Sequence, residues 1–411
     1  MTFSKRFTTA IATGAVLINA LAPIAFADSV TVSGNGAFSN NAVNSSVNTT
    51  TAVNQSNNAN IVNNVTSNAS TGGNSSNFNT GGDSRIVTGN ATTNTSVSTA
   101  ANLNKASIDN CGACSGGATN VTVSGNGAYS TTGVALNKEN SVFLNQTNNA
   151  NILNDVNAKA NTGKNDNSFN TGGDAVTVTG NATTNVKVAN KANANDATIG
   201  GGNGAGDPSS ITITGNGAFS ENGVAMNQAS AVVLDQSNVA NLANYVDAKA
   251  NTGKNGSTFN TGGFTGISTG DAKTNVTVDN AVNFNNANVG CDCVLGGTDL
   301  KVAGNGAESF NAIDANNENA LFDAQDNNTA LLNNVDGNAK TGKNDVSFST
   351  ADVDGDPLVV TGNSTSTTHV DNTGNVNLFN NGSTLHLPGN WDLGVNFDLF
   401  GLFANFSHMV V

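Results

Sequence analysis

The sequence contains one set of landmarks four times, at spacings that barely change from copy to copy. Each copy opens with the glycine of a Gly-Asn-Gly turn, at Gly34, Gly125, Gly215 and Gly304. A glutamine follows at one constant interval, at Gln55, Gln146, Gln236 and Gln325. A phenylalanine follows at a second constant interval, at Phe78, Phe169, Phe259 and Phe348. Surface loops tolerate insertions, so this constancy indicates that the whole interval is structural.

These landmarks divide the chain into segments. Four are repeats, at 28–117, 118–209, 210–298 and 299–379. The last repeat is degenerate, because Gly362 lies farther from Gly304 than Gly89 lies from Gly34. The two other segments are residues 1–27 at the start and 380–411 at the end. Atypical terminal repeats are expected where a stack of repeats ends.

Alternation of small apolar or β-branched residues with polar ones runs through every copy. Val186, Val188, Asn190 and Ala192 share one parity, and so do Val47, Thr49, Thr51 and Val53. That period is typical of half-buried strands. Helix signals are nearly absent, because Asn, Gly and Thr are poor helix formers. The sequence therefore predicts an all-β fold.

Within each copy, a predicted turn of Asn and small residues recurs at short intervals, at Asn35-Gly36-Ala37, Asn57-Asn58-Ala59, Asn74-Ser75-Ser76 and Gly89-Asn90-Ala91. Such intervals suit the short coils of a β-solenoid (β-helix), whose interior would hold small apolar side chains and Asn ladders. About five coils a copy would give a rod about 90 Å long. The alternative is four β-sandwich domains, but these need bulky cores, and aromatic residues are only 5%.

Residues 1–27 have the features of a secretory signal peptide. Lys5 and Arg6 precede an apolar run from Ala10 to Ala22, and Ala25-Phe26-Ala27 matches a cleavage site. We therefore expect a secreted chain. The whole chain has a net charge of −14, which argues against nucleic acid as a partner. No later stretch is apolar enough to predict a transmembrane anchor.

Residues 380–411 form the only aromatic-rich segment. It contains Trp391, Phe397, Phe400, Phe403 and Phe406. We expect this segment to be a hydrophobic cap on the last coil; the alternative is a docking surface for another subunit or the cell envelope.

Four cysteines lie in equivalent loops, at Cys111 and Cys114 and at Cys291 and Cys293. With about ten coils between the two pairs they would be about 45 Å apart, too far for a bridge or shared zinc site. Local disulfides are then expected, and bridges between chains are the alternative.

Two other groups of charged residues have candidate roles. Asp352, Asp354 and Asp356 could offer oxygens to calcium, but no calcium-loop pattern surrounds them, so we expect solvated acids and no cofactor. Lys164, Lys254 and Lys343 repeat in a Thr-Gly-Lys-Asn turn, and a lysine beside an asparagine suggests an isopeptide link as one hypothesis. We expect exposed turn lysines that discourage edge pairing.

One short motif resembles a known family. The segments Gln55 to Ile61, Gln146 to Ile152 and Gln236 to Leu242 look like the Gln-x-x-Asn-x-Ala core of curlin-type repeats, the β-solenoid subunits of bacterial surface fibres. The Asn-rich copies also resemble haemagglutinin-type secreted β-helices. Both resemblances imply structural or adhesive work outside the cell.

The sequence favours a non-catalytic protein of the cell surface or extracellular matrix that associates with itself into fibres. The alternative is a ligand-binding rod, either an adhesin for glycans or other surface proteins, or an ice-binding protein suggested by Thr93 and Thr95. A polysaccharide-acting β-helix enzyme is disfavoured, because no cluster of Asp, Arg or His recurs from coil to coil.

Overall fold

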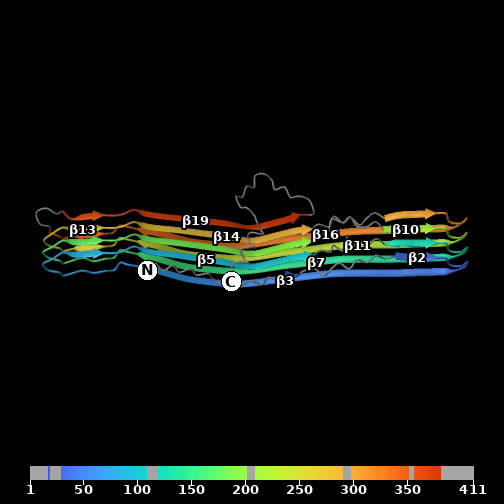
Figure 1. The fold of residues 1–411 in the computed structure, drawn as a ribbon, viewed down its shortest axis with the longest axis horizontal. Coiled ribbons are helices and arrows are strands. Elements are labelled where there is room, and N and C mark those ends of the chain that lie inside the picture. Colours follow the sequence, from blue (N-terminus) through green and yellow to red (C-terminus); the bar gives the residue numbers. More distant parts are fainter. Residues whose placement is uncertain are drawn as a thin grey trace.

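The protein is an all-β molecule, as the sequence predicts. A computed structural model describes residues 17–18, 29–108, 119–200, 209–289, 298–350 and 356–380. These residues contain strands and turns but no helix, and therefore no helix that could cross a membrane. Every strand pairing among them is parallel, and the strands run along the long axis of a flat, elongated body (Figure 1).

Two large sheets form the broad faces of the molecule. The first, here called the long sheet, contains β16 (Phe310–Lys340), β11 (Glu221–Asn251), β7 (Thr131–Asn161) and β3 (Asn40–Ser70). The second, the return sheet, contains β19 (Ser364–Asn380), β14 (Ala272–Val289), β9 (Ala182–Ile199), β5 (Ala91–Ile108) and the very short β1 (Leu17–Ile18).

Three smaller sheets complete the outline. One, at one end of the body (Figure 1), contains β15 (Thr298–Ala303), β10 (Ser209–Thr214), β6 (Asn120–Ser124) and β2 (Ser29–Ser33). Another, at the opposite end, contains β18 (Leu358–Val360), β13 (Thr265–Ser268), β8 (Ala175–Val178) and β4 (Ser84–Val87). The two-stranded sheet contains β12 (Gly256–Thr258) and β17 (Asp345–Ser347).

One circuit of the chain, here called a coil, takes a whole repeat. Asn40 pairs with Thr131, Thr131 with Glu221, and Glu221 with Phe310, at sequence separations of 91, 90 and 89. The separation becomes 92 between Ala272 and Ser364, which places the irregular spacing of the last repeat between β17 and β19. Neighbouring strands therefore come from successive repeats, and the segments do not form separate sandwiches.

The predicted division of each repeat into several short coils is wrong. Asn57, which was assigned to a turn, lies in the middle of the straight strand β3, with its side chain 8% exposed in the interior. An Asn beside a small residue has the same sequence pattern whether it turns the chain or points inward from a strand. The predicted rod of about 90 Å is therefore also wrong, because its length assumed about twenty short coils stacked on one another.

The real dimensions follow from the strands. A strand of 31 residues, such as β7, spans about 100 Å, whereas four strands stacked about 4.8 Å apart rise only about 14 Å between the first and the last. The long dimension therefore lies along the strands, across the direction of stacking (Figure 1).

The same correction applies to the cysteine loops. The last residues of β5 and β14, Ile108 and Val289, both pair with Ile199, so they lie two strand spacings, about 9.6 Å, apart. The expected distance of about 45 Å assumed about ten coils between the cysteine pairs, and the two coils observed do not exclude a bridge between them. Cys111, Cys114, Cys291 and Cys293 themselves lie outside the described residues.

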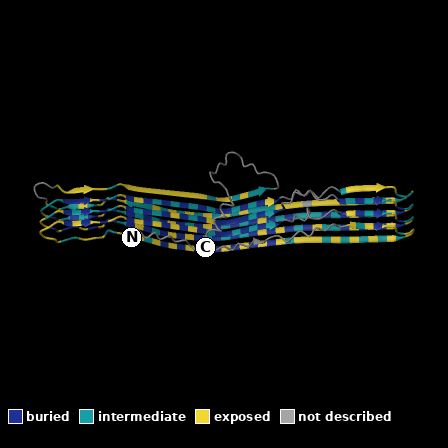
Figure 2. Cartoon of the chain, in the orientation of Figure 1, coloured by how far each residue is buried: buried dark blue, intermediate teal, exposed yellow. Residues whose placement is uncertain are grey.

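The core lies between the long sheet and the strands opposite it. Inward residues of β3, β7 and β11 alternate with outward ones, as the period of two requires (Figure 2). The first part of the long sheet packs against the β2 sheet, as Val134 does against Val121 and Val123, and the later part packs against the return sheet, as Leu144 does against Ile199. Small apolar clusters along this interior alternate with columns of amide side chains.

The recurring Thr-Gly glycines are required by close approach between coils. A Cβ on Gly163 would lie 2.0 Å from the carbonyl oxygen of Gly253, and one on Gly72 would lie 2.0 Å from that of Gly163. Backbone atoms cannot yield as a flexible side chain does. The stack therefore admits only glycine at this position in the first three coils.

We expect Gly163→Ala to lower the free energy of unfolding by about 1–3 kcal/mol, the usual range for overpacking. Gly133→Ala is the matched control, because a Cβ there meets nothing within 4 Å, and it should change stability by no more than about 1 kcal/mol. Urea unfolding followed by circular dichroism measures both. Equal effects would show that coil contact does not fix this glycine.

Candidate functional site: the open edges of the stack

The repeated glutamines form a buried column of hydrogen bonds. Gln146 Nε2 donates to Gln55 Oε1 at 2.7 Å, Gln236 Nε2 to Gln146 Oε1 at 2.8 Å, and Gln325 Nε2 to Gln236 Oε1 at 2.7 Å. Each glutamine also donates to a carbonyl of the return sheet, as Gln146 does to Asp196 at 3.2 Å. The column thus joins neighbouring coils and the two sheets.

Asparagines extend this network across the interior. Asn148, which is 0% exposed, donates to the side chains of Asn195 at 2.8 Å and Asn238 at 3.0 Å. It accepts from Asn57 and Asn104, both at 3.1 Å. An amide is both donor and acceptor, so the same residue satisfies its counterpart in the next coil.

Aromatic side chains stack at both ends of the elongated body. Phe78, Phe169, Phe259 and Phe348 form one column, with ring centroids 5.0, 5.0 and 4.9 Å apart. Phe38, Tyr129 and Phe219 form another, at 5.1 and 4.9 Å. Every one of these residues has a left-handed backbone, with φ between 53° and 64°. Bulky residues rarely adopt this conformation, so stacking compensates a local backbone cost.

The amide columns and one aromatic column reach the last coil, whereas the other aromatic column stops at the third coil, where Phe219 is followed by Glu308. We call the unpaired side of β15, β16, β18 and β19 the tail edge. Leu300 and Val302 are 53% and 50% exposed there, whereas Ile211 and Ile213, which pair with them, are 0% exposed. Nothing among the described residues donates to Gln325 Oε1. The tail edge therefore has the donors, acceptors and apolar side chains of a coil, but no described coil upon it (Figure 2).

The opposite side of the stack, formed by β2, β3, β4 and β5, is the head edge. Phe38 and Phe78 are 77% and 75% exposed there. Part of this edge is occupied, because β1 pairs with Lys105 and Ala106 of β5. The charges of the two edges differ: residues 28–117 contain three acidic and two basic residues, whereas residues 299–379 contain twelve acidic and three basic ones.

One carboxylate of the last coil points inward. Asp323 occupies the position of Leu234 and Leu144 in the preceding coils, beside the apolar cluster to which both leucines belong. Its Oδ1 is buried without a hydrogen bond, and desolvation by burial raises the pKa of this carboxyl above its ordinary value. The other acids of β16 occupy outward positions, at Asp314, Glu318, Asp326 and Asp336.

The positions singled out in the sequence have distinct places in the structure. The opening glycines, Gly34, Gly125, Gly215 and Gly304, have φ between 63° and 72° and form the turn before each long strand. Thr93 and Thr95 are 3% and 5% exposed, so this pair cannot face ice, contrary to the hypothesis drawn from it.

Other candidates fall partly or wholly outside the described residues. These include Asp352, Asp354, Trp391, Phe397, Phe400, Phe403 and Phe406, whereas Asp356 is described and exposed. Within the described part of the chain, no three His, Cys, Asp or Glu side chains are grouped as metal ligands.

Sequence reasoning missed Asp323 and the aromatic columns as interacting groups. The intervals between residues in the sequence contained a signal for Asp323 and a signal for the aromatic columns. Asp323 precedes Gln325 by two positions, as Leu234 precedes Gln236, and the phenylalanines recur at the coil interval. Recognising them required the coil length, which fixes the residues that lie next to each other.

Comparison of the chain with protein-family models, with curated proteins and with solved structures gives no match. We therefore infer function from the geometry of the edges and faces.

Replacing a buried amide should cost more than replacing an exposed one. We expect Asn148→Ala to lower the free energy of unfolding by at least about 2 kcal/mol, because several buried partners lose a hydrogen bond. Asn241→Ala removes an exposed bond to Asn151 and should change stability by about 0.5 kcal/mol or less. Denaturant titration of both variants tests this, and similar losses would argue against the interior network.

Asp323 should make the last coil less stable as the pH rises. Because its pKa is raised in the folded state, its proton-linked stabilisation is complete below the pKa of the unfolded chain and is lost as the pH rises through the folded pKa. Asp323→Asn should therefore be more stable than the wild type at neutral pH, and this advantage should shrink in acid. Asp326→Asn, at an exposed outward position, is the control. Thermal unfolding of all three proteins across pH measures the difference, and a pH-independent gap contradicts the assignment.

Proposed function

We propose that this chain is a secreted, non-catalytic structural protein of the cell surface or extracellular matrix that stacks head to tail into filaments. The observation that carries the proposal is the continuity of the coils. The tail edge offers a new chain the backbone pairing that β11 offers to all 31 residues of β16. Exposed strand edges with regular geometry are templates for further strands.

A second copy placed on the tail edge would extend the existing columns. Its Gln55 would lie over Gln325, whose Oε1 lacks a donor among the described residues, and its Phe78 would lie over Phe348, which is 77% exposed. Two positions match poorly. Val53 would lie over Asp323, and burial of that carboxylate is unfavourable. Phe38 would lie over Glu308, which interrupts its aromatic column. The partner that fits the tail edge is therefore the head edge of this same chain.

The charge distribution supports this polarity. Two tail edges brought together would oppose two coils with twelve acidic residues each, whereas a head edge belongs to a coil with three. Like charges at close range disfavour the symmetric contact. The signal-peptide features of residues 1–27 support export, and removal of that segment would also remove β1 from the head edge.

We expect the chain that lacks residues 1–27 to form filaments visible by electron microscopy. The strands should lie across the filament axis, and fibre diffraction should show a reflection near about 4.8 Å along it. Persistently single particles, over a range of protein concentrations, would contradict the proposal. So would filaments whose growth requires removal of residues 381–411, since that segment would then be the natural occupant of the tail edge.

A matched pair of substitutions tests the edge directly. Leu321 and Leu332 lie on β16 and are 47% and 50% exposed, but Leu321 pairs with the buried Val232 and points inward, whereas Leu332 points outward. Leu321→Lys should stop filament growth because it places a charge in the interior of the contact. Leu332→Lys should permit growth. Sedimentation of both variants gives the comparison.

A further inference from the structure

A groove with an unusual lining lies on the outer face of the long sheet, where its strands end. Its volume is about 440 Å³. Five lysines and no acidic residue line it, together with amide, hydroxyl and alanine groups. The lysines are Lys159, Lys164, Lys249, Lys254 and Lys340. A basic surface of this kind is unexpected in a chain with a net charge of −14.

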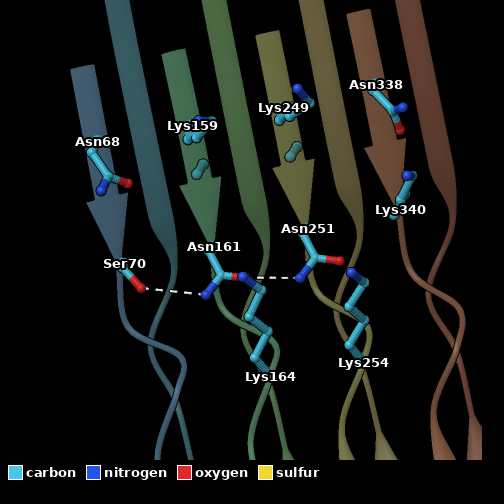
Figure 3. Close-up of a pocket in the computed structure, with 12 residues that line it drawn as sticks. Asn68, Ser70, Lys159, Asn161, Lys164, Lys249, Asn251, Lys254, Asn338 and Lys340 are labelled. Atoms are coloured by element: carbon cyan, nitrogen blue, oxygen red, sulfur yellow. Dashed lines mark hydrogen bonds between the residues drawn. The ribbon is translucent and has the colours of Figure 1, made fainter. Parts of the chain in front are cut away.

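The lysines come from different parts of the coil and meet at the groove. Lys159 and Lys249 lie near the ends of β7 and β11, whereas Lys164 and Lys254 lie in the turns that follow. In Figure 3 the side chains of Lys164 and Lys254 run side by side from those turns back toward Asn161 and Asn251. Strand and turn therefore direct their ammonium groups into the same space.

Asparagine amides form the floor between the lysines. Asn251 Nδ2 donates to Asn161 Oδ1 at 2.8 Å, and Asn161 Nδ2 donates to Ser70 Oγ at 3.3 Å. Lys340 occupies the next position of this column in the fourth coil. The lining thus combines positive charge with groups that can exchange hydrogen bonds with hydroxyls.

Most of this charge has no counterion among the described residues. Lys249 pairs with Asp247, but Lys159, Lys164, Lys254 and Lys340 take part in no ion pair within that part of the chain. Four cations gathered on a common surface repel one another, and that repulsion is relieved by a bound anion.

The turn lysines also occupy a costly backbone conformation. Lys164, Lys254 and Lys343 have φ of 63°, 62° and 61°, in the left-handed region that favours glycine. The first coil has Gly73 at the corresponding position, with φ of 83°. Glycine would satisfy this turn without strain, so fold stability does not account for lysine there.

We propose that this groove binds an acidic polysaccharide. Successive lysines lie one coil apart, about 4.8 Å. The groove therefore presents a row of positive charges, and not a single point at which a small anion would bind. A polymer with a carboxylate on each sugar matches such a row, and the asparagine amides suit its hydroxyls. Single-stranded nucleic acid fits less well, because no aromatic side chain lines the groove to stack on bases.

This site uses other groups than the contacts that would join one copy to the next, although outward residues of the edge strands β3 and β16 help to line it. Its lysines lie on the outer face of the long sheet and in the turns after it, whereas stacking uses the backbone and inward side chains of the tail edge. Loss of filaments would therefore leave glycan binding intact, and loss of glycan binding would leave filament growth intact.

The test is calorimetric titration of the full chain with polygalacturonate at low ionic strength. The double variant Lys164→Gly/Lys254→Gly should bind about tenfold more weakly, as expected for the loss of two charge contacts. It should unfold at the same or a higher denaturant concentration than the wild type, because glycine relieves the left-handed turn. Weaker binding without a loss of stability would show that these lysines serve a ligand rather than the fold.

The control is Lys187→Ala/Lys191→Ala, which removes the same charge from exposed positions of β9 on the return sheet. It should retain wild-type affinity, and neutral dextran should not bind to any of the proteins. The proposal is overturned if polygalacturonate does not bind, if both double variants lose affinity equally, or if an oligothymidylate binds as tightly as polygalacturonate.

Discussion

Parallel, in-register pairing places every side chain of this protein beside the same position of the next coil. A buried polar side chain therefore lies against its own counterpart in the next coil and can exchange a hydrogen bond with it. Asn and Gln meet this requirement because one amide donates while the next accepts, as in the column from Gln55 to Gln325. Lysine or aspartate in an interior column would face a like charge. The abundance of Asn is consistent with this constraint, because more of the buried polar side chains are amides than hydroxyls.

Sequence reasoning reached the strands because the alternation of residues is local. Val186, Val188 and Asn190 are buried on the parity that their pattern predicts, and the Thr-Gly glycines of the first three coils are sites where only glycine fits. The coil length could not be reached in this way. Asn57 in β3 and Asn35 in a true turn both have an alanine two positions later, and the long-range pairing of β3 places Asn57 in a strand. The predicted length of the rod failed for that reason.

In a stack of identical coils, no coil differs from the others in a way that would stop further coils from adding. The last coil of this protein differs from the others at positions that would contact the next coil. Glu308 follows Phe38, Tyr129 and Phe219 in the turn before the long strand, and Asp323 follows Val53, Leu144 and Leu234 in the core. An inward-pointing charge makes an edge strand a poorer template without disrupting the coil beneath it. The tail edge therefore remains geometrically competent for stacking, while its charges make that stacking weaker and more selective.

The lysine columns show how the same constraint acts on an outer face. Lys159 and Lys249 are paired positions, so their charges lie within a coil spacing of each other, where repulsion even in water is about 1 kcal/mol. The column is interrupted at both sides, by Asn68 in the first coil and Asn338 in the fourth. Head-to-tail stacking would then separate each pair of lysines from the next by two uncharged residues. The groove would recur once in every copy as a discrete site, and the ladder would avoid an unbroken row of like charges.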